Sequence, residues 1–336
     1  MKPLVSILIP AYNSAPWIAE TIQSVLNQTW AAKELIVVVD DGSRDQTLAV
    51  ARQFAAPNVS VVSRPHQGVA AARNEAYDLC QGEYIQWLDA DDLLAPDKIA
   101  RQMAVAETIA SKRTLLSSPW AYFNYRTAKA RFEPSALWCD LAPGEWLLRK
   151  MGDNLHMQPG TWLVRREIIE AAGRWDERVV VDEDGEYFCR LVLASDGIRF
   201  VPDARVFYRL SGSGSSVQRT LFKAPERWAS FQLQLAHLRS LGDTGRVRQA
   251  CVNFLQNWLV YFYPENPEII REAEALAASL GGRLVMPRLR WKYAWMEKLW
   301  DFETAKRAQF MIPQFKAGIV RQWDKFMYDW EKRSRT

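Results

Sequence analysis

The feature of the sequence that most constrains the fold is a regular alternation of apolar runs and amphipathic segments over the first 90 residues. The apolar runs lie at residues 4–10, 34–40, 59–64 and 84–89, and segments with helical spacing lie between them at residues 16–28, 44–55 and 68–80. Strands that are buried on both faces read as continuous apolar runs. Because helical segments separate these strands, the pattern predicts an α/β fold with a mostly parallel central sheet and helices on both faces.

Polar residues gather where the predicted strands end. The first, second and fourth runs lead into Pro10, Tyr12 and Asn13, into Asp40, Asp41, Gly42 and Ser43, and into Asp89, Asp91 and Asp92, respectively. In a parallel sheet the carboxyl ends of the strands meet at one edge, and ligands collect there. We therefore predict a binding site at this edge of the sheet.

The acidic residues after the fourth run favour a metal. Mg²⁺ or Mn²⁺ is typically held by one or two carboxylates together with substrate phosphate oxygens. The first strand–helix turn, residues 10–14, contains no Gly, which excludes a dinucleotide fingerprint and a P-loop. An Asp-x-Asp pattern is weak by itself, and the alternative is a helix cap with solvated charges before the helix predicted at residues 95–110. Its position at the end of a buried strand favours the metal.

Composition limits the remaining classes. Hydrophobic residues make up 49% of the chain and charged residues 24%, as in a globular protein with a sizeable core. The net charge of +4 is too small to argue for nucleic acid as a partner. The four cysteines form no C-x-x-C pair, so we expect lone buried thiols in a reducing compartment. The N-terminal apolar run is too short for a signal peptide, and no run approaches the ~18–20 residues of a membrane span. We expect a cytoplasmic protein, or one that lies on the inner face of the membrane.

Six stretches of the chain stand in an order and spacing typical of one family. They are residues 5–30, 34–47, 68–76, 84–99, 161–177 and 181–209. They resemble the family 2 glycosyltransferases of the GT-A fold, over residues 1 to about 210. The resemblance implies an inverting enzyme that moves a sugar from a nucleotide-diphosphate donor, a UDP-sugar, to a hydroxyl of a glycan or lipid-linked acceptor.

The resemblance also implies a donor site at the strand ends. The nucleotide-binding positions would be Pro10, Ala11, Tyr12, Asp41, Gly42, Arg73, Asp89 and Ala90. Asp41 would accept a hydrogen bond from uracil, Arg73 would reach toward the phosphates, and Asp91 would be the direct ligand of Mn²⁺ or Mg²⁺. Asp92 would be a cap or a supporting group. For Arg73 the alternative is a surface position on a helix.

A second acidic cluster, residues 182–186, resembles the catalytic motif of the family. The resemblance makes Asp184 the general base and Glu183 its neighbour, and no covalent nucleophile is required. The alternative is a helix N-terminus stabilised by acidic residues. The two roles conflict, because a helix N-terminus lowers the pKa of a carboxylate whereas a useful base needs a raised pKa.

Two other classes remain as alternatives. A nucleotidyltransferase would open with a Gly-rich first loop, which is absent here. A non-catalytic sugar-nucleotide-binding protein would be expected to lack Asp91 or Asp184, and both are present. Within the resemblance the chain also departs from the family, because residues 208–216 contain no His to add to the metal or phosphate site. Their Gly/Ser run suits a flexible lid.

Two histidines of the first 217 residues lie near the motifs. His66 follows the third apolar run, so we expect it in a loop beside the nucleotide. His156 precedes the stretch at residues 161–177, and one interpretation places it in the acceptor pocket. For each of them an ordinary structural role is the alternative.

From about residue 218 the strand signals stop and helical patterns follow, so we expect a catalytic domain at residues 1–217 and a helical region at residues 218–336. Residues 283–336 contain thirteen Lys or Arg and six Asp or Glu. Trp291, Trp295, Leu299 and Phe302 have the spacing of one helical stripe, and Trp323, Phe326, Met327 and Trp330 repeat it. Two interpretations stay open: the stripes pack on the catalytic domain or on a second copy of the chain, or they contact an anionic membrane.

Overall fold

The computed structural model describes residues 2–211, 223–296, 299 and 301–334. Its central sheet has seven strands in the order β3-β2-β1-β4-β8-β6-β9. These are β1 (Val5–Leu8), β2 (Lys33–Asp41), β3 (Val59–Arg64), β4 (Tyr84–Trp87), β6 (Thr114–Ser117), β8 (Leu163–Arg165) and β9 (Gly197–Phe200). Neighbouring strands are parallel except on either side of β8, which pairs antiparallel with both β4 and β6. The predicted mostly parallel sheet is confirmed.

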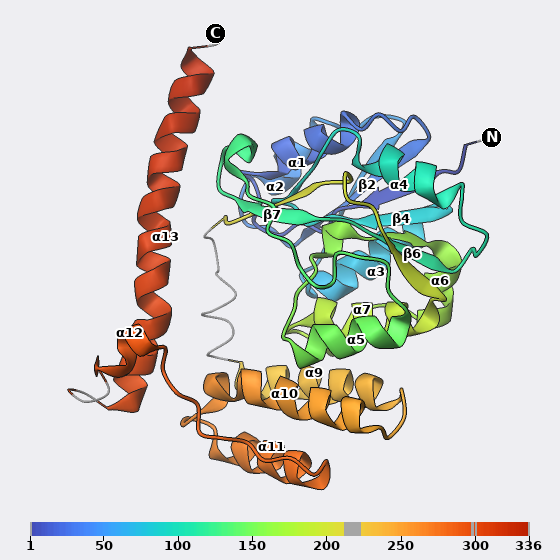
Figure 1. The fold of residues 1–336 in the computed structure, drawn as a ribbon. Helices are drawn as coiled ribbons and strands as arrows, with labels where there is room; N and C mark the ends of the chain where they lie inside the picture. The colour runs from blue at the N-terminus through green and yellow to red at the C-terminus, as the bar shows by residue number, and fades with distance from the viewer. Residues whose placement is uncertain (1, 212–222, 297–298, 300, 335–336) are drawn as a thin grey trace.

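Helices cover both faces of the sheet, as predicted (Figure 1). One face packs against α1 (Ile18–Leu26), α2 (Thr47–Arg52) and α4 (Lys98–Ala106), and the other against α3 (Val69–Leu79), α5 (Pro143–Gly152), α6 (Arg166–Ala172) and α7 (Glu183–Ala194). Within the first strand Val5 and Ile7 join one core cluster and Leu8 joins the other. This double burial is why the strands read as unbroken apolar runs.

A second sheet of three short strands lies beside the ends of the central strands. Its order is β5-β10-β7, made of β5 (Leu93–Leu94), β10 (Val206–Arg209) and β7 (Trp120–Phe123). β5 follows the acidic residues at the end of β4, and it pairs antiparallel with β10. The small sheet therefore fixes the stretch from Asp89 to Asp92 between two ordered segments.

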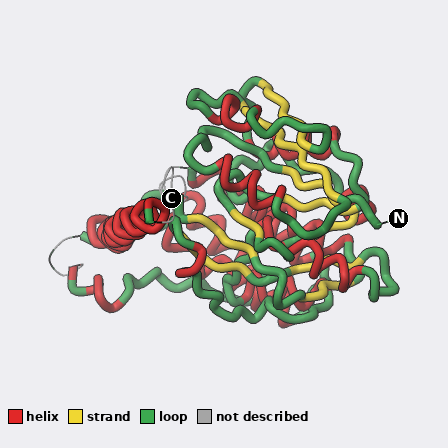
Figure 2. The backbone as a smooth tube through the Cα atoms, turned by 90° about the horizontal axis from the view of Figure 1, so that it is seen from above, coloured by secondary structure: helices red, strands yellow, loops and turns green. Residues whose placement is uncertain are grey.

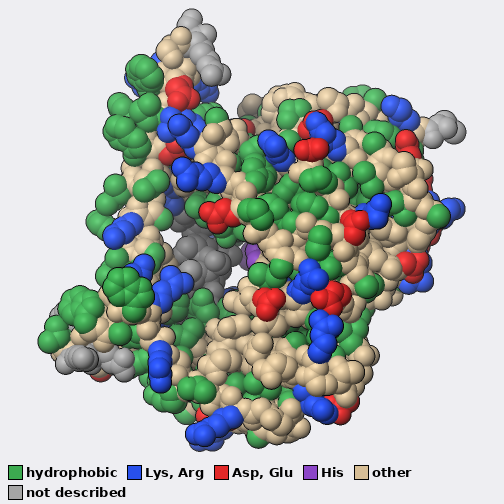
Figure 3. Space-filling model, viewed as in Figure 1, with side chains coloured by type: hydrophobic (Ala, Val, Ile, Leu, Met, Phe, Trp, Pro, Cys, Tyr) green, Lys and Arg blue, Asp and Glu red, His purple; other side chains and the backbone are tan. Residues whose placement is uncertain are grey.

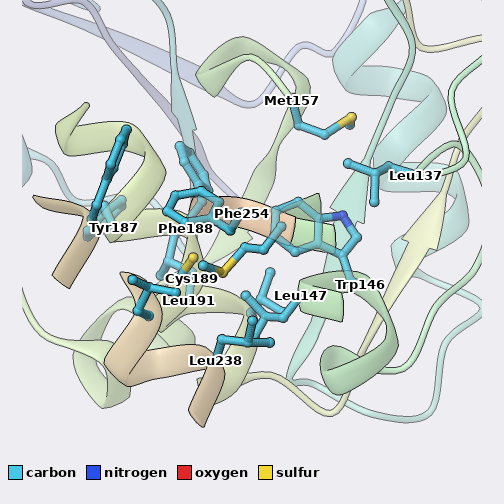
Figure 4. Packing of buried hydrophobic residues seen from close by; sticks show 14 of the residues in the cluster. Leu137, Trp146, Leu147, Met157, Tyr187, Phe188, Cys189, Leu191, Leu238 and Phe254 are labelled. Carbon is cyan, nitrogen blue, oxygen red and sulfur yellow. The ribbon is translucent and has the colours of Figure 1, made fainter. Parts of the chain in front are cut away.

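From residue 223, where the described chain resumes, three helices share a core with the rest of the protein. They are α9 (Ala224–Arg239), α10 (Gly245–Phe262) and α11 (Pro267–Ser279). Leu238 of α9 and Phe254 of α10 belong to the same buried cluster as Trp146 of α5 and Phe188 of α7 (Figure 4). The predicted boundary at residues 217/218 lies within residues 212–222, outside the described part of the chain. The predicted lid also falls there, apart from Leu210 and Ser211.

The last two helices stand apart from this core. α12 (Trp291–Ala294) is short, and α13 (Phe302–Arg333) is 32 residues long and runs alongside the body in both views (Figures 1 and 2). The prediction that residues 291–302 form one stripe of a single helix is wrong, because α12 ends at Ala294 and α13 begins at Phe302. The side chain of Asp301 caps this second helix by accepting a hydrogen bond from the backbone N–H of Thr304 at 2.7 Å. Three cysteines are buried as expected, whereas Cys139 is exposed.

Candidate active site

The turn after β2 forms one end of the site. Asp41 is almost fully buried, and its two carboxylate oxygens accept hydrogen bonds from the backbone N–H groups of Gln67 at 2.7 Å and Gly68 at 2.6 Å. Gly42 has φ +73°, and a Cβ there would lie 2.9 Å from the Cβ of His66, so the turn requires glycine. The sequence indicated a turn here but not its tight closure on the loop after β3.

An aromatic surface lies beside this turn. The ring of Tyr12 stacks on the ring of His66 with centroids 4.5 Å apart, and Nδ1 of His66 lies 2.6 Å from the backbone oxygen of Asp41. Tyr12 is among the exposed large side chains, so one face of its ring is accessible. Pro10 and Ala11 are buried beneath this surface. The accessible face of Tyr12 can stack on a flat, partly apolar group.

Arg73 lies at the centre of the site and not on a helix surface. Its side chain is 3% exposed. It donates hydrogen bonds to Oδ1 of Asp89 at 2.9 Å and to Oε1 of Glu183 at 3.2 Å, and its guanidinium lies 4.2 Å from the ring centre of Trp175. Arg73 therefore links the acidic turn after β4 to the start of α7, two segments that are about a hundred residues apart in the sequence.

The turn after β4 partly buries the side chain of Asp91 and fully buries that of Asp92. Burial, with Asp89 adding to it, raises the pKa of Asp91 to about 6. Asp92 accepts the backbone N–H of Arg209 at 2.8 Å, and burial raises its pKa well above the usual value as well. Arg209 also donates to the backbone oxygen of Asp91 at 2.7 Å, so it fixes the turn from β10. Asp92 accordingly supports the turn, as the resemblance implied.

Ala90, which lies between Asp89 and Asp91, is fixed through its backbone. Ala90 is buried, and its carbonyl oxygen accepts a hydrogen bond from Oγ1 of Thr21 in α1 at 2.9 Å. The turn is thus attached to α1 as well as to β10.

The donor set of this turn fits a divalent cation. Asp89 and Asp91 are neighbouring carboxylates, and a raised pKa at Asp91 means that a positive charge there would be favourable. Within the described residues there is no group of three side chains arranged as a complete metal site. Phosphate oxygens of a ligand would therefore have to complete the coordination, as is usual for Mg²⁺.

The start of α7 holds Asp184. Asp182, just before the helix, has φ +57°, a left-handed conformation that is uncommon for a non-glycine residue. Its carboxylate accepts a hydrogen bond from Nε2 of Gln234 at 2.5 Å, and its backbone oxygen accepts one from Oγ of Ser230 at 3.2 Å. Both donors are buried residues of α9. The C-terminal helices therefore hold the turn that carries the acidic pair.

Burial raises the pKa of both acids at the start of α7, Glu183 and Asp184, so the electrostatics suit either of them as a base. Burial, with Asp182 adding to it, raises the pKa of Asp184, while His156 and Arg73 oppose the shift. The pKa of Asp184 is therefore shifted upward, in the direction that a general base needs. Glu186 differs, because hydrogen bonds from His237 and Arg190 lower its pKa although burial alone would raise it.

Hydrogen bonding separates the two adjacent acids as well. Glu183 accepts a hydrogen bond from Arg73, whereas in the described part of the chain the carboxylate of Asp184 accepts one only from the backbone N–H of Gly185 at 3.0 Å. Asp184 thus has free capacity to accept a proton. His156 lies close enough to affect its pKa, and its ring meets the edge of Trp120.

Sequence reasoning missed four residues that shape the site: Trp175, Arg209, Ser230 and Gln234. Trp175 and Arg209 stand inside stretches that resemble the family, so the pattern contained a signal for them. Ser230 and Gln234 are ordinary polar positions of a helix, and no local pattern distinguishes them. A shallow cavity of about 500 Å³ at the far edge of the sheet, lined by Asp140 and Arg199 among others, contains none of the site residues.

We expect Gly185→Ala to lower kcat by roughly tenfold or more, because small displacements of catalytic groups are costly. A Cβ at this position would lie 2.6 Å from Oδ2 of Asp182, which Gln234 already holds. Asp182 would have to move, and the turn carrying Asp184 with it. The matched control is Gly144→Ala in α5, where the new Cβ would make only ordinary contact with Leu241 at 3.5 Å. Equal activity of the two variants would contradict this role of the turn.

Comparison with known proteins agrees with this geometry. The family model described as glycosyl transferase family 2 matches residues 6–172. The chondroitin synthase of Escherichia coli is 44% identical over 99 residues, which are 29% of this chain and 14% of that protein. The chain thus matches only a small part of this curated relative's length.

Solved structures show the fold. The structure of S. aureus TarS residues 1–349 in complex with UDP is similar with a TM-score of 0.62 and 17% identity, over 92% of this chain and 91% of that one. The mannosyltransferase PcManGT of Pyrobaculum calidifontis, in complex with GDP-Man and Mn²⁺, is similar with a TM-score of 0.55 and 18% identity, over 97% and 88%. The expected GT-A type fold is confirmed by these likenesses. Motifs, family model and fold agree, and the chain belongs to glycosyltransferase family 2.

Proposed function

We propose that this chain is an inverting glycosyltransferase that moves a sugar from a UDP-sugar to a hydroxyl of a glycan or lipid-linked acceptor. The observation that carries the proposal is the Arg73 bridge. It brings the acidic turn of Asp89 and Asp91 next to Glu183 and Asp184, with hydrogen bonds of 2.9 and 3.2 Å. A site for a diphosphate leaving group and a base for an attacking hydroxyl are then neighbours.

The donor end of the proposal rests on Tyr12 and Asp41. The accessible face of Tyr12 would stack on a nucleobase, and Asp41 would accept a hydrogen bond from a ring N–H such as that of uracil. TarS is known in complex with UDP and with UDP-GlcNAc, which supports a uridine nucleotide. PcManGT is in complex with GDP-Man, so the nucleotide has to be tested directly.

The chemistry requires few groups. Asp91, with Asp89 and phosphate oxygens of the donor, would hold Mn²⁺ or Mg²⁺, which neutralises negative charge on the leaving diphosphate. Asp184 takes the proton of the acceptor hydroxyl as that oxygen attacks the anomeric carbon. The bond from that carbon to the diphosphate breaks on the opposite side, so the configuration inverts. Arg73 holds Asp89 and Glu183 in place and offsets the charge of the cluster.

The alternatives are less well supported. A nucleotidyltransferase has no use for Asp184 beside the donor site, and the first turn lacks the glycines that such an enzyme would be expected to have. A non-catalytic binding protein has no need of a carboxylate whose pKa burial has raised and whose oxygens remain available.

We expect UDP and UDP-sugars, in the presence of Mn²⁺, to raise the melting temperature of the protein, because a ligand that binds only the folded state stabilises it by mass action. The measurement is a thermal-shift panel of UDP, UDP-GlcNAc, UDP-glucose and GDP-mannose. Asp41→Asn should reduce the shift given by uridine nucleotides more than Asp140→Asn, a carboxylate far from the site. A larger shift with GDP-mannose would contradict the choice of nucleobase, and no shift with any donor would contradict the proposed function.

A further inference from the structure

From Lys306 onward, the long helix α13 contacts the described body of the protein along one face, which we call the inner face. Asp324 accepts hydrogen bonds from Nε of Arg126 at 2.7 Å and from the backbone N–H of Tyr125 at 2.9 Å. Lys306 forms an ion pair with Glu265 at 2.7 Å. Aromatic contacts add to these ion pairs, since Phe302 meets the ring of Tyr263 and Phe310 meets that of Tyr261. The attachment therefore uses other apolar residues than those on the opposite face of the helix.

The opposite face of α13 is apolar and exposed. This outer face consists of Ile312, Phe315, Ile319, Trp323, Phe326 and Trp330, whose exposed fractions range from 38% to 73%. At 100° per residue the six side chains fall within roughly 80° of one another, and the stripe is about 27 Å long. Lys306 and Asp324 lie on the other side of the helix by the same spacing. Figure 3 shows hydrophobic side chains along the edge of α13 that faces away from the sheet.

More apolar surface continues from the base of α13. Trp291 is 88% exposed, and Trp295 and Leu299 are more than half exposed. A contiguous exposed surface with this many large aromatic side chains marks an interaction site. The interpretation that the stripes pack on the catalytic domain is therefore wrong for the outer face.

The charges beside the outer face are mainly basic. Asp324 and Glu331 both pair with Arg126, and Lys306 pairs with Glu265. With these three set aside, α13 contains six Lys or Arg and two Asp or Glu. By the same spacing Lys316 and Arg333 lie beside the apolar surface, whereas the other basic side chains lie toward the far side of the helix. The net positive charge of α13 would complement an anionic surface.

We propose that α13 binds an anionic membrane surface, with the outer face inserted among the lipid head groups and the basic side chains on phosphates. Helices of this kind lie in the plane of the interface, with Trp and Phe on one face and Lys or Arg on the other. Among the described helices none is long and apolar enough to cross a membrane, so α13 rests on the surface. A second copy of the chain fits less well, because Lys316 and Arg333 beside each outer face would bring like charges together.

The proposal goes beyond the transfer reaction and does not depend on the donor or on Asp184. A protein held in this way would meet an acceptor that is itself attached to the membrane.

The test is co-sedimentation of the full-length protein with sucrose-loaded vesicles of phosphatidylcholine, with and without phosphatidylserine. We expect binding to the anionic vesicles that weakens when the salt is raised from about 0.05 to about 0.5 M. The variant Trp323→Ala/Phe326→Ala/Trp330→Ala should bind at least about tenfold more weakly. The matched control, Leu79→Ala/Tyr122→Ala/Val180→Ala, removes three exposed side chains elsewhere and should bind as the wild type does.

A second variant keeps the test decisive if the first one disturbs α13. Lys316→Gln/Arg321→Gln/Lys332→Gln leaves the outer face intact and should weaken binding while reducing its salt dependence. Full-length protein that stays in the supernatant at low salt would overturn the proposal. So would a dimer in light scattering that the Trp323 variant converts to a monomer, without vesicle binding by either protein, because the outer face would then cover a second copy.

Discussion

Asp184→Asn is expected to lower kcat by about 10²–10⁴-fold, the usual contribution of a general base, and to leave nucleotide affinity within a few-fold of the wild type. The reason is chemical, since an amide has nearly the shape of the carboxylate but does not accept a proton. Steady-state kinetics with a donor found in the thermal-shift panel, together with titration of UDP, measure the two effects separately.

The control for this result is Glu183→Gln, next to Asp184. Glu183 already accepts a hydrogen bond from Arg73 at 3.2 Å, and an amide oxygen can accept it as well. We expect a smaller loss of kcat than for Asp184→Asn. If Asp184→Asn kept its activity and Glu183→Gln lost it, the roles of the two residues would have to be exchanged. Glu186 is the weaker candidate, because Arg190 and His237 hold it as an anion.

Asp91→Asn is expected to lower activity by orders of magnitude and to raise the Mn²⁺ concentration needed for half-maximal activity, because the variant loses a negative metal ligand. Asp92→Asn provides the contrast. Asp92 is buried against the backbone of Arg209, and an amide oxygen can accept the same N–H, so this variant should fold normally and have less effect on the Mn²⁺ requirement. Full activity of Asp91→Asn in the presence of EDTA would refute the metal assignment.

The raised pKa of Asp91 predicts how metal binding depends on pH. The pKa of Asp91 is raised to about 6, and only the deprotonated carboxylate binds a cation. At pH 7 most of the protein has this group ionised, whereas at pH 5 about one molecule in ten does. The apparent affinity for Mn²⁺ should therefore fall by about tenfold between pH 7 and pH 5. Isothermal titration with Mn²⁺ and UDP measures this change, and Asp91→Asn should show less of it.

Part of the site could be predicted because its signals are local. Asp41, Asp89 and Asp91 each follow a buried strand directly, and a parallel sheet brings such positions to one edge. The fold class was predictable for the same reason, since the strand and helix periods alternate without ambiguity. The reversed strand β8 gave no such signal, because a single antiparallel strand within the sheet has the same apolar pattern as its neighbours.

Other parts depend on contacts between distant segments. The sequence around Arg73 is compatible with a surface position or with a phosphate contact. In the structure α7 approaches the end of β4, so Arg73 is buried and pairs with both Asp89 and Glu183. The hydrogen bond from Gln234 to Asp182 spans 52 residues, and the left-handed backbone of Asp182 is held by it. Neither propensity nor spacing could have indicated these contacts.

Because α9 holds the turn of Asp182, a fragment of this chain that ends before α9 would lose the support of that turn. The segment that matches the family model ends at residue 172, before the acidic pair, and the helices that hold the pair come later still. A fragment made to those family limits would contain the donor turns but neither the base nor its scaffold. Chimaeras that exchange the C-terminal helices between relatives would also exchange the contacts that align Asp184. Activity in such a chimaera would depend on whether the new helix supplies donors equivalent to Ser230 and Gln234.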